Sequence, residues 1–292
     1  MTGNLFALAS AIAWAAAVVL FKKSGEHFDA FGLNWFKSVV ALLLFAVTLP
    51  LAGIAFLPGA PPGHLLLLLG SGVAGVALAD TLFFRTLALI GAARAAIVSC
   101  LYTPLVAAAS MLWLGETPTF KEVAGGLLVL SAVLLTQVRG ISRDLAPGAL
   151  PRGILLGALS MAANAASVVA VKPILSGYPV IWSSGVRLLG GAVGLTLLAP
   201  ATAAGGRKAL AVFTPQRGWR VAVPAAFVGT YLSVMLWLAG FKYGATNSAA
   251  VLNQTTTLFT VVLAAMFLRE RFTPWHGAAT ALAFAGAAII VW

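Results

Sequence analysis

The stretch LFALASAIAWAAAVVLFKK, residues 5–23, carries no charged side chain before its two terminal lysines. It has about the length that crosses the hydrocarbon layer of a bilayer, roughly 20 apolar residues. The rest of the chain has the same character, because 61% of the 292 residues are hydrophobic and only 9% are charged. Soluble domains carry about 25% charged residues. The composition therefore excludes a soluble enzyme and a disordered chain, and it indicates an integral membrane protein.

Further apolar runs follow along the chain, separated by charges, proline or glycine, and each has a length that suits a membrane-spanning helix. We expect helices rather than a membrane barrel, because the runs lack the period-two alternation of barrel strands. The predicted fold class is an all-α integral membrane protein with ten transmembrane helices. The expected helices cover residues 3–21, 32–54, 64–84, 94–114, 121–138, 153–172, 179–199, 219–241, 246–268 and 274–292.

The two halves of the chain resemble each other. At offsets of 150 and then 154 residues, the matched pairs include Ser10 with Ser160, Lys22 with Lys172, Lys37 with Arg187, Gly75 with Gly229 and Glu116 with Glu270. An ordered set of matches indicates a duplication. Five helices per copy is an odd number, so the second copy enters the membrane from the opposite side, as in many secondary transporters. We predict a first repeat over residues 1–140, a polar linker over 141–152 and a second repeat over 153–292.

These features resemble the drug/metabolite transporter superfamily, in the branch with paired EamA domains. The resemblance covers essentially the whole chain and rests on a basic residue in the second helix of each half, a proline in the fourth helix, and a leucine–glutamate motif before a threonine. These positions are Lys37, Arg187, Pro104, Leu114-Gly115-Glu116 before Thr119, and Leu268-Arg269-Glu270 before Thr273. The second half has Thr257-Leu258 in place of Pro104. If the proline kink gates access, the halves are expected to move differently.

The resemblance implies a secondary transporter that exports amino acids or related small metabolites by alternating access, with proton exchange as a candidate driving force. An uptake permease and a sugar-phosphate or nucleotide-sugar exchanger are alternatives within transport. The exchanger ranks lower, because it would need more intramembrane cations. An intramembrane enzyme would need a nucleophile beside a base, which the apolar runs do not offer. A non-transporting scaffold predicts a dry, fully packed centre instead of a cavity.

Three charged residues fall inside the expected helices and away from their ends. Asp80 is the acid placed away from helix ends, and a carboxylate there should face a cavity or a cation, where it could carry a proton or meet a substrate amine. The alternatives are a structural ion pair with Lys37 or Arg85, or hydration near the interface. Lys37 and Arg187 occupy equivalent turns and could hold an anionic substrate group. Alternatively, their stems reach the interface and place the charges in water.

Polar and aromatic residues inside the helices complete the candidate substrate site. Five polar residues in succession, Asn253-Gln254-Thr255-Thr256-Thr257, are unfavourable in lipid unless they line water or bond to other helices. The single aromatic residues also suit ordinary packing. The full set of candidate substrate-binding residues is Trp14, Lys37, Asp80, Tyr102, Asn164, Arg187, Tyr231, Trp237, Asn253 and Gln254, with Asp80 also the candidate for proton coupling.

The other chemistry-bearing residues point away from catalysis. No cofactor or metal site is expected, since the three histidines are scattered and Cys100 is the single cysteine. Glu116 and Glu270 are interpreted as loop-closing residues at helix ends, with Thr119 and Thr273 as helix caps. The glycines of Gly70-Ser71-Gly72-Val73-Ala74-Gly75 fit close helix packing better than nucleotide binding, because no strand precedes them.

The net charge of +11 is interpreted as loop charge that orients helices, not as a nucleic-acid site. When alternate loops are assigned to opposite sides, most lysines and arginines fall on one side, and Lys121, Lys172 and Lys242 fall on the other. The positive-inside rule then places both termini outside, whereas the family resemblance favours cytoplasmic termini; we prefer the charge count. The expected location is the plasma membrane, the inner membrane if the cell is bacterial. The expected partners are lipid and a small substrate, and one chain suffices to enclose a path, with a homodimer as the alternative.

Overall fold

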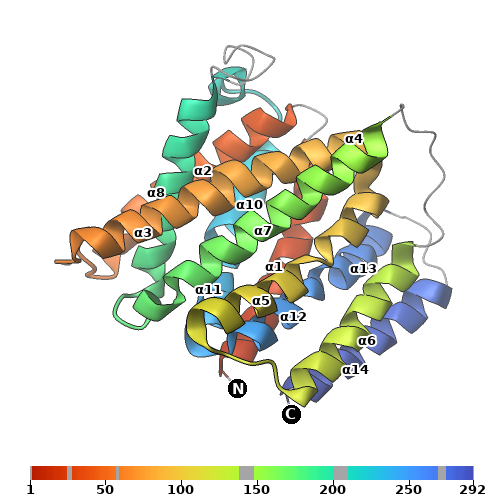
Figure 1. The fold of residues 1–292 in the computed structure, drawn as a ribbon. Helices are drawn as coiled ribbons and strands as arrows, with labels where there is room; N and C mark the ends of the chain where they lie inside the picture. Colours follow the sequence, from red (N-terminus) through yellow and green to blue (C-terminus); the bar gives the residue numbers. More distant parts are fainter. Residues whose placement is uncertain are drawn as a thin grey trace.

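A computed structural model describes residues 2–24, 28–56, 59–137, 148–199, 210–268 and 274–291, and these fold almost entirely into helices (Figure 1). The first half contains α1 (Thr2–Ser24), α2 (Ala30–Leu51), α3 (Pro62–Gly72), the π-helix η1 (Val73–Ala79), α4 (Asp80–Ser99), α5 (Tyr102–Leu114) and α6 (Phe120–Gln137). The second half contains α7 (Ala149–Leu175), α8 (Val180–Leu198), η3 (Ala211–Phe213), α10 (Trp219–Ala225), the π-helix η4 (Ala226–Ser233), α11 (Val234–Tyr243), α12 (Thr246–Gln254), α13 (Thr256–Leu268) and α14 (Pro274–Val291). Most of the predicted linker lies outside the described residues.

Six segments of the described chain are long and apolar enough to cross a membrane, three in each half. They are Thr2–Phe21, Phe31–Leu51, Pro62–Phe83, Ala149–Leu175, Val180–Leu198 and Trp219–Tyr243. The chain is therefore a multi-pass membrane protein. Of the other expected spans, the fourth and the ninth are each divided into two helices, while α6 and α14 correspond to the fifth and the tenth.

One expected boundary is wrong. The loop predicted at residues 85–93, between the third and fourth spans, is helical and belongs to α4. Arg85 and Arg94 suggested an interfacial loop, but leucine, alanine and arginine are good helix formers and no proline interrupts the segment. The chain leaves the helix later, at Cys100 and Leu101, inside what was predicted to be a continuous fourth helix.

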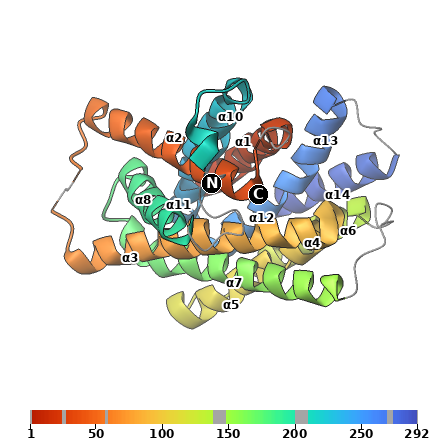
Figure 2. The same cartoon turned by 90° about the horizontal axis from the view of Figure 1, so that it is seen from above.

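The two halves run through the molecule in opposite directions. α1 begins at the end of the molecule where both termini lie, whereas α7, the first helix of the second half, begins at the opposite end (Figure 1). The termini lie close together in both views (Figure 2), and the side-chain amide of Asn4 donates a 3.4 Å hydrogen bond to the carbonyl of Ile290. This arrangement agrees with the predicted inverted repeat.

The irregular segments of the two halves correspond. The π-helices η1 and η4 are related by the same offset of about 154 residues that relates Gly75 to Gly229. The breaks after α4 and after α12, at Leu101 and Thr255, are separated by the same offset. The second break forms without a proline. The Leu252 carbonyl accepts both the backbone N–H of Thr255, at 3.1 Å, and its hydroxyl, at 2.6 Å, and such a local side-chain bond competes with the regular helical pattern. The halves thus share this interruption, although only the first has a proline, Pro104, directly after it.

Glycine lets α3 and α8 approach closely. A Cβ atom on Gly72 would lie 1.7 Å from the backbone oxygen of Arg187, so no other residue fits there. A Cβ on Gly75 would lie 2.8 Å from the hydroxyl oxygen of Ser167, whereas one on Gly70 would meet nothing within 4 Å. Two of the three glycines in the predicted packing motif therefore serve helix contact.

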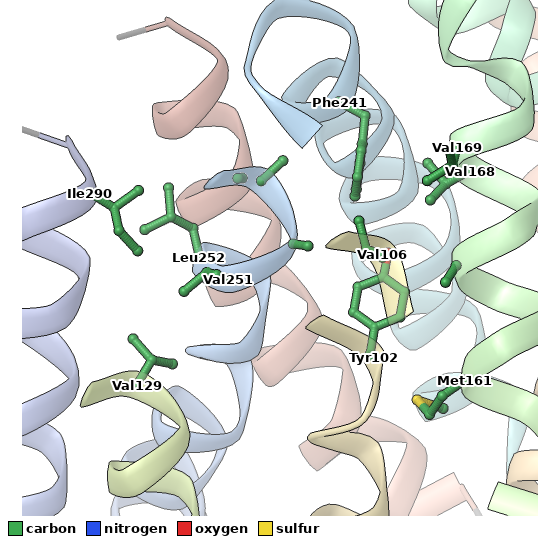
Figure 3. Close-up of a cluster of buried hydrophobic side chains, with 14 of the residues drawn as sticks. Tyr102, Val106, Val129, Met161, Val168, Val169, Phe241, Val251, Leu252 and Ile290 are labelled. Carbon is green, nitrogen blue, oxygen red and sulfur yellow. The ribbon is translucent and has the colours of Figure 1, made fainter. Parts of the chain in front are cut away.

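The main apolar cluster joins the two halves (Figure 3). Its larger members come from α5, α6, α7, α11, α12 and α14, and they are Tyr102, Val106, Val129, Met161, Val168, Val169, Phe241, Val251, Leu252 and Ile290. Lipid tails are as apolar as these side chains, so close packing rather than exclusion of water stabilises the cluster. Tyr102 and Met161 also line a polar cavity between the halves, so this cluster forms part of the cavity wall.

Candidate functional site

A cavity of about 300 Å³ lies between the two halves. Residues from both repeats line it, and many of them are polar, which disagrees with the dry centre expected of a scaffold. The lining consists of Ser10, Trp14, Lys37, Gly75, Val76, Asp80, Phe83, Ser99, Tyr102, Ser160, Met161, Asn164, Arg187, Leu188, Thr230, Ser233, Val234, Trp237, Asn253, Gln254, Thr256 and Thr257.

Every candidate site residue except Tyr231 lies on this cavity. Tyr231 belongs to η4, where its neighbour Thr230 faces the cavity. The Tyr231 ring instead packs on Phe45 of α2, with ring centres 4.6 Å apart, and on Phe227. The tyrosine is therefore a packing residue of the wall and not part of its inner surface.

Lys37 and Asp80 form an ion pair in the cavity. The Nζ atom of Lys37 lies 3.2 Å from an oxygen of Asp80, and the lysine side chain is only 5% exposed. The Nζ atom also lies 5.7 Å from the centre of the Trp14 ring, within range of a cation–π interaction. Lys37 comes from α2, and Asp80 is the first residue of α4, where η1 ends. Asp80 is thus paired with Lys37 on the cavity, and the lysine side chain is buried in the protein instead of extending to its surface.

Arg187, the counterpart of Lys37 in the second repeat, is equally buried, at 4% exposure. Its guanidinium donates 2.7 Å and 2.9 Å bonds to the Ser71 hydroxyl and the Ser167 carbonyl, and a 3.4 Å bond to the Ser167 hydroxyl. The charge also lies 5.5 Å from the centre of the Trp237 ring. Serine and backbone oxygens hold this cation, and no carboxylate of the described residues lies within ion-pair distance of it.

The polar run predicted in mid-helix coincides with the break between α12 and α13. Asn253, Gln254, Thr256 and Thr257 line the cavity. Gln254 also donates a 2.9 Å bond to the carbonyl of Ser99, the last residue of α4, where the equivalent break occurs. The run therefore lines the cavity, and through Gln254 it also forms a hydrogen bond between helices.

Two serines at matched positions of the repeats were not among the candidate site residues. Ser160 of α7 donates a 2.7 Å bond to the carbonyl of Ala79 at the end of η1. Its counterpart Ser10 of α1 donates a 3.0 Å bond to the carbonyl of Ser233 at the end of η4. Each π-helix thus receives a hydroxyl from the other repeat. The matched positions in the two halves were the signal that could have identified this pair.

Glu116 closes one end of the molecule between the repeats. Its carboxylate lies 2.9 Å from the Nζ atom of Lys172 in α7 and accepts a 3.1 Å bond from the backbone N–H of Thr246 at the start of α12. Burial raises the pKa of this carboxyl, but the bonds from Lys172 and Thr246 outweigh that effect, and the pKa lies below its usual value. The expected loop-closing role agrees with these contacts.

Thr119 caps α6 as expected, together with Glu122, which the sequence analysis did not single out. The Thr119 N–H donates a 2.7 Å bond to Glu122, and the Glu122 N–H donates a 3.3 Å bond to the Thr119 hydroxyl. This reciprocal pair is a capping box. Glu122 also accepts a 2.6 Å bond from Ser248 of α12. Glu270 and Thr273, the counterparts of Glu116 and Thr119, lie outside the described residues.

No group of histidine, cysteine, aspartate and glutamate within the described ranges could hold a metal ion. Of the scattered histidines, His64 shares a 2.8 Å hydrogen bond with the hydroxyl of Tyr178, near one end of the bundle. The functional groups that gather in the cavity are instead two cations, one carboxylate, hydroxyls, amides and tryptophan rings. These groups suit reversible binding of a small polar molecule.

Two inverted helical repeats around a shared polar cavity define the class of membrane transporters built from internal repeats. The chain belongs to the EamA-like transporter family, whose model matches residues 1–138 and again residues 151–292. The match agrees with the resemblance to the drug/metabolite transporter superfamily. The members of this family are transporters and not enzymes.

The fold recurs in a solved structure. A solved structure, titled only as the crystal structure of a protein, superposes with a TM-score of 0.80 over 98% of this chain and 95% of that chain. The sequences are 19% identical, so this likeness concerns the fold alone. No curated protein matches the sequence.

Proposed function

We propose that this protein is a secondary transporter that exports amino acids or related small metabolites by alternating access. One observation carries the proposal: residues of both inverted repeats line a single cavity that contains an ion pair and a further buried cation. Buried charges in a membrane-spanning segment are unfavourable and mark substrate or ion pathways. A non-transporting scaffold does not require such buried charges.

Irregular helices at the cavity support a mechanism of alternating access. Residues of η1, of η4 and beside the breaks at Leu101 and Thr255 line the cavity, as in transporters whose discontinuous helices form the binding site. Their matched positions give the two repeats equivalent points of bending. Rocking of one repeat against the other would then expose the cavity to each side in turn.

Asp80 is the proposed site of proton coupling. Its carboxylate faces the cavity, its side chain is 28% exposed, and its ionic partner Lys37 belongs to a different helix. Protonation would weaken the ion pair and release Lys37 for other contacts. A proton and a substrate could therefore occupy the cavity in competition, which is the requirement for exchange of one against the other.

The test is counterflow in proteoliposomes that contain the purified chain. Amino acids, organic acids and sugar phosphates serve as radiolabelled substrates, with and without an imposed pH gradient. We expect concentrative exchange of one class of compound and acceleration by the gradient. Asp80→Asn should retain counterflow but lose the response to pH.

Two results would contradict parts of this proposal. Unchanged pH dependence in the Asp80→Asn variant would remove Asp80 from coupling. Absence of exchange for every class, with protein that is folded and inserted, would contradict transport itself. Net flux measured from vesicles loaded on one side then decides between export and uptake.

A further inference from the structure

The two equivalent cations of the cavity are neutralised differently. Lys37 forms an ion pair with Asp80, and the two formal charges cancel. The hydrogen bonds of Arg187 go to Ser71 and Ser167, whose oxygens are uncharged. An arginine side chain does not lose its proton in proteins. The charged residues that line the cavity therefore sum to one net positive charge, located at Arg187.

The sequence of the two repeats explains this asymmetry. The counterpart of Asp80, 154 residues later, is Val234, so the second repeat has no carboxylate to offer Arg187. The counterparts of Ser167 and Ser71 are Ala17 and Ala225, so no matching hydroxyls are present for Lys37. The duplication has kept both cations but has given a fixed counter-charge to only one of them.

A buried cation without a counter-charge is strongly stabilised by an anion. We propose that the cavity selects a small monovalent organic anion, such as a monocarboxylate with an apolar or aromatic body, and that its charged group pairs with Arg187. This inference rests on the proposed transport function and selects among its substrates. A zwitterionic amino acid has no net charge and would leave the positive charge of Arg187 uncancelled, so the inference favours the related monocarboxylate metabolites. A monoanion leaves the cavity neutral, whereas a dianion or a cation leaves it charged.

The surroundings of Arg187 suit such a ligand. The guanidinium has five N–H groups, and the three bonds to serine leave donors for a carboxylate. Trp237 and Phe83 supply aromatic surface on the same cavity, and the volume of about 300 Å³ is in the range of small-molecule sites. The buried hydroxyls of Thr230 and Thr256 have no hydrogen-bond partner and are available to polar atoms of the ligand.

The experiment compares compounds that share one skeleton and differ in charge. Benzoate, benzamide, benzylamine and phthalate form an aromatic set, and isovalerate with its amide and amine forms an aliphatic set. Binding to the purified chain is measured by tryptophan fluorescence, since Trp14 and Trp237 line the cavity. Uptake is measured separately by counterflow. We expect the monocarboxylate of at least one set to bind about tenfold more tightly than its amide, amine and dicarboxylate.

Matched variants assign the effect to one cation. Arg187→Gln should weaken monocarboxylate binding by about tenfold or more, whereas Lys242→Gln, which removes a cation outside the cavity, should bind within about threefold of wild type. Arg187→Lys keeps the charge and serves if the glutamine variant does not fold. Preference for the amide or amine, or equal loss of binding in Arg187→Gln and Lys242→Gln, would overturn the inference. Monocarboxylate binding without counterflow would support the inference and contradict transport. Neutral compounds that bind and are exchanged would support transport and contradict the inference.

Discussion

The Lys37–Asp80 ion pair joins α2 to α4 at a position where neither charge would be stable alone. Removing one member leaves the other buried without a partner, which is more unfavourable than removing both. We expect Lys37→Met to reduce the free energy of unfolding by about 2 kcal/mol, a lower figure than for fully buried pairs because Asp80 is 28% exposed. The double variant Lys37→Met/Asp80→Asn should lie within about 1 kcal/mol of wild type. Thermal unfolding in detergent measures both, and equal loss in the two variants would contradict the argument.

The contacts of Glu116 make stability depend on pH at the closed end of the molecule. Its pKa is lower in the folded protein than in the unfolded chain, so the carboxylate stabilises the fold at neutral pH, and this contribution is lost as the pH falls through the folded-state pKa. The pair is partly exposed, so the contribution is about 0.2–1 kcal/mol. Glu116→Gln should therefore melt at a lower temperature than wild type at pH 7, and the difference should shrink below about pH 4. A difference that stays constant with pH would mean that the charge of Glu116 is not involved.

At the scale of elements, the contact of α3 with α8 depends on Gly72. Its Cβ position lies 1.7 Å from a backbone oxygen of Arg187, so Gly72→Ala forces the two helices apart and moves Arg187 in the cavity. We expect a loss of about 3 kcal/mol or more and weak ligand binding. Gly70→Ala on the same helix is the control. It meets nothing within 4 Å and should be neutral or stabilising, because alanine is the better helix former. Similar melting temperatures for the two variants would contradict this packing role.

The sequence predicted helices where apolar length and composition decide them, as in α1, α2, α7 and α8. It misplaced features that depend on local hydrogen bonding. The break at Thr255 occurs where the N–H and the hydroxyl of one threonine both bond to the Leu252 carbonyl. The π-helices end where Ser10 and Ser160 of the other repeat bind their carbonyls. The serines and the carbonyls that they bind lie far apart in the chain, so no local pattern indicates these bonds.

The candidate site was predicted for a related reason. An ionisable or amide side chain inside an apolar run needs polar partners or water. Asp80, Arg187 and Asn253 meet this need by lining the cavity. The argument is weaker for aromatic residues, which are stable in a cavity wall and in a packed core alike. Tyr231 shows this limit, since its ring found Phe45 instead of the cavity. The partners of Arg187 were beyond prediction because Ser71 and Ser167 lie in different repeats.

At the scale of the whole molecule, the net positive charge of the cavity should make part of the transport cycle sensitive to membrane potential. With a monoanion bound the cavity is neutral, whereas the empty form carries one charge. A charge that crosses the full field changes in energy by about 2.3 kcal/mol per 100 mV. Counterflow, in which both half-cycles are loaded, should be insensitive to a potassium–valinomycin potential, and net flux, which needs return of the empty form, should respond to it. Equal responses of the two processes would contradict this distribution of charge.

The π-helices η1 and η4 also set the angular phase of the α-helical residues that come after them. Successive residues of an α-helix are turned by about 100° around its axis, and the wider turns of a π-helix take up an additional residue without lengthening the path by a full α-helical step. Asp80 is the first residue after η1, and Val234 is the first after η4. The wide turns therefore change, in both halves, the direction in which the following side chains leave the helix axis. In one repeat this direction brings the Asp80 carboxylate to Lys37, and in the other it brings the apolar Val234 to the cavity. A single substitution at Asp80 or Val234 would therefore change the charge of the cavity while the π-helix before it stays the same.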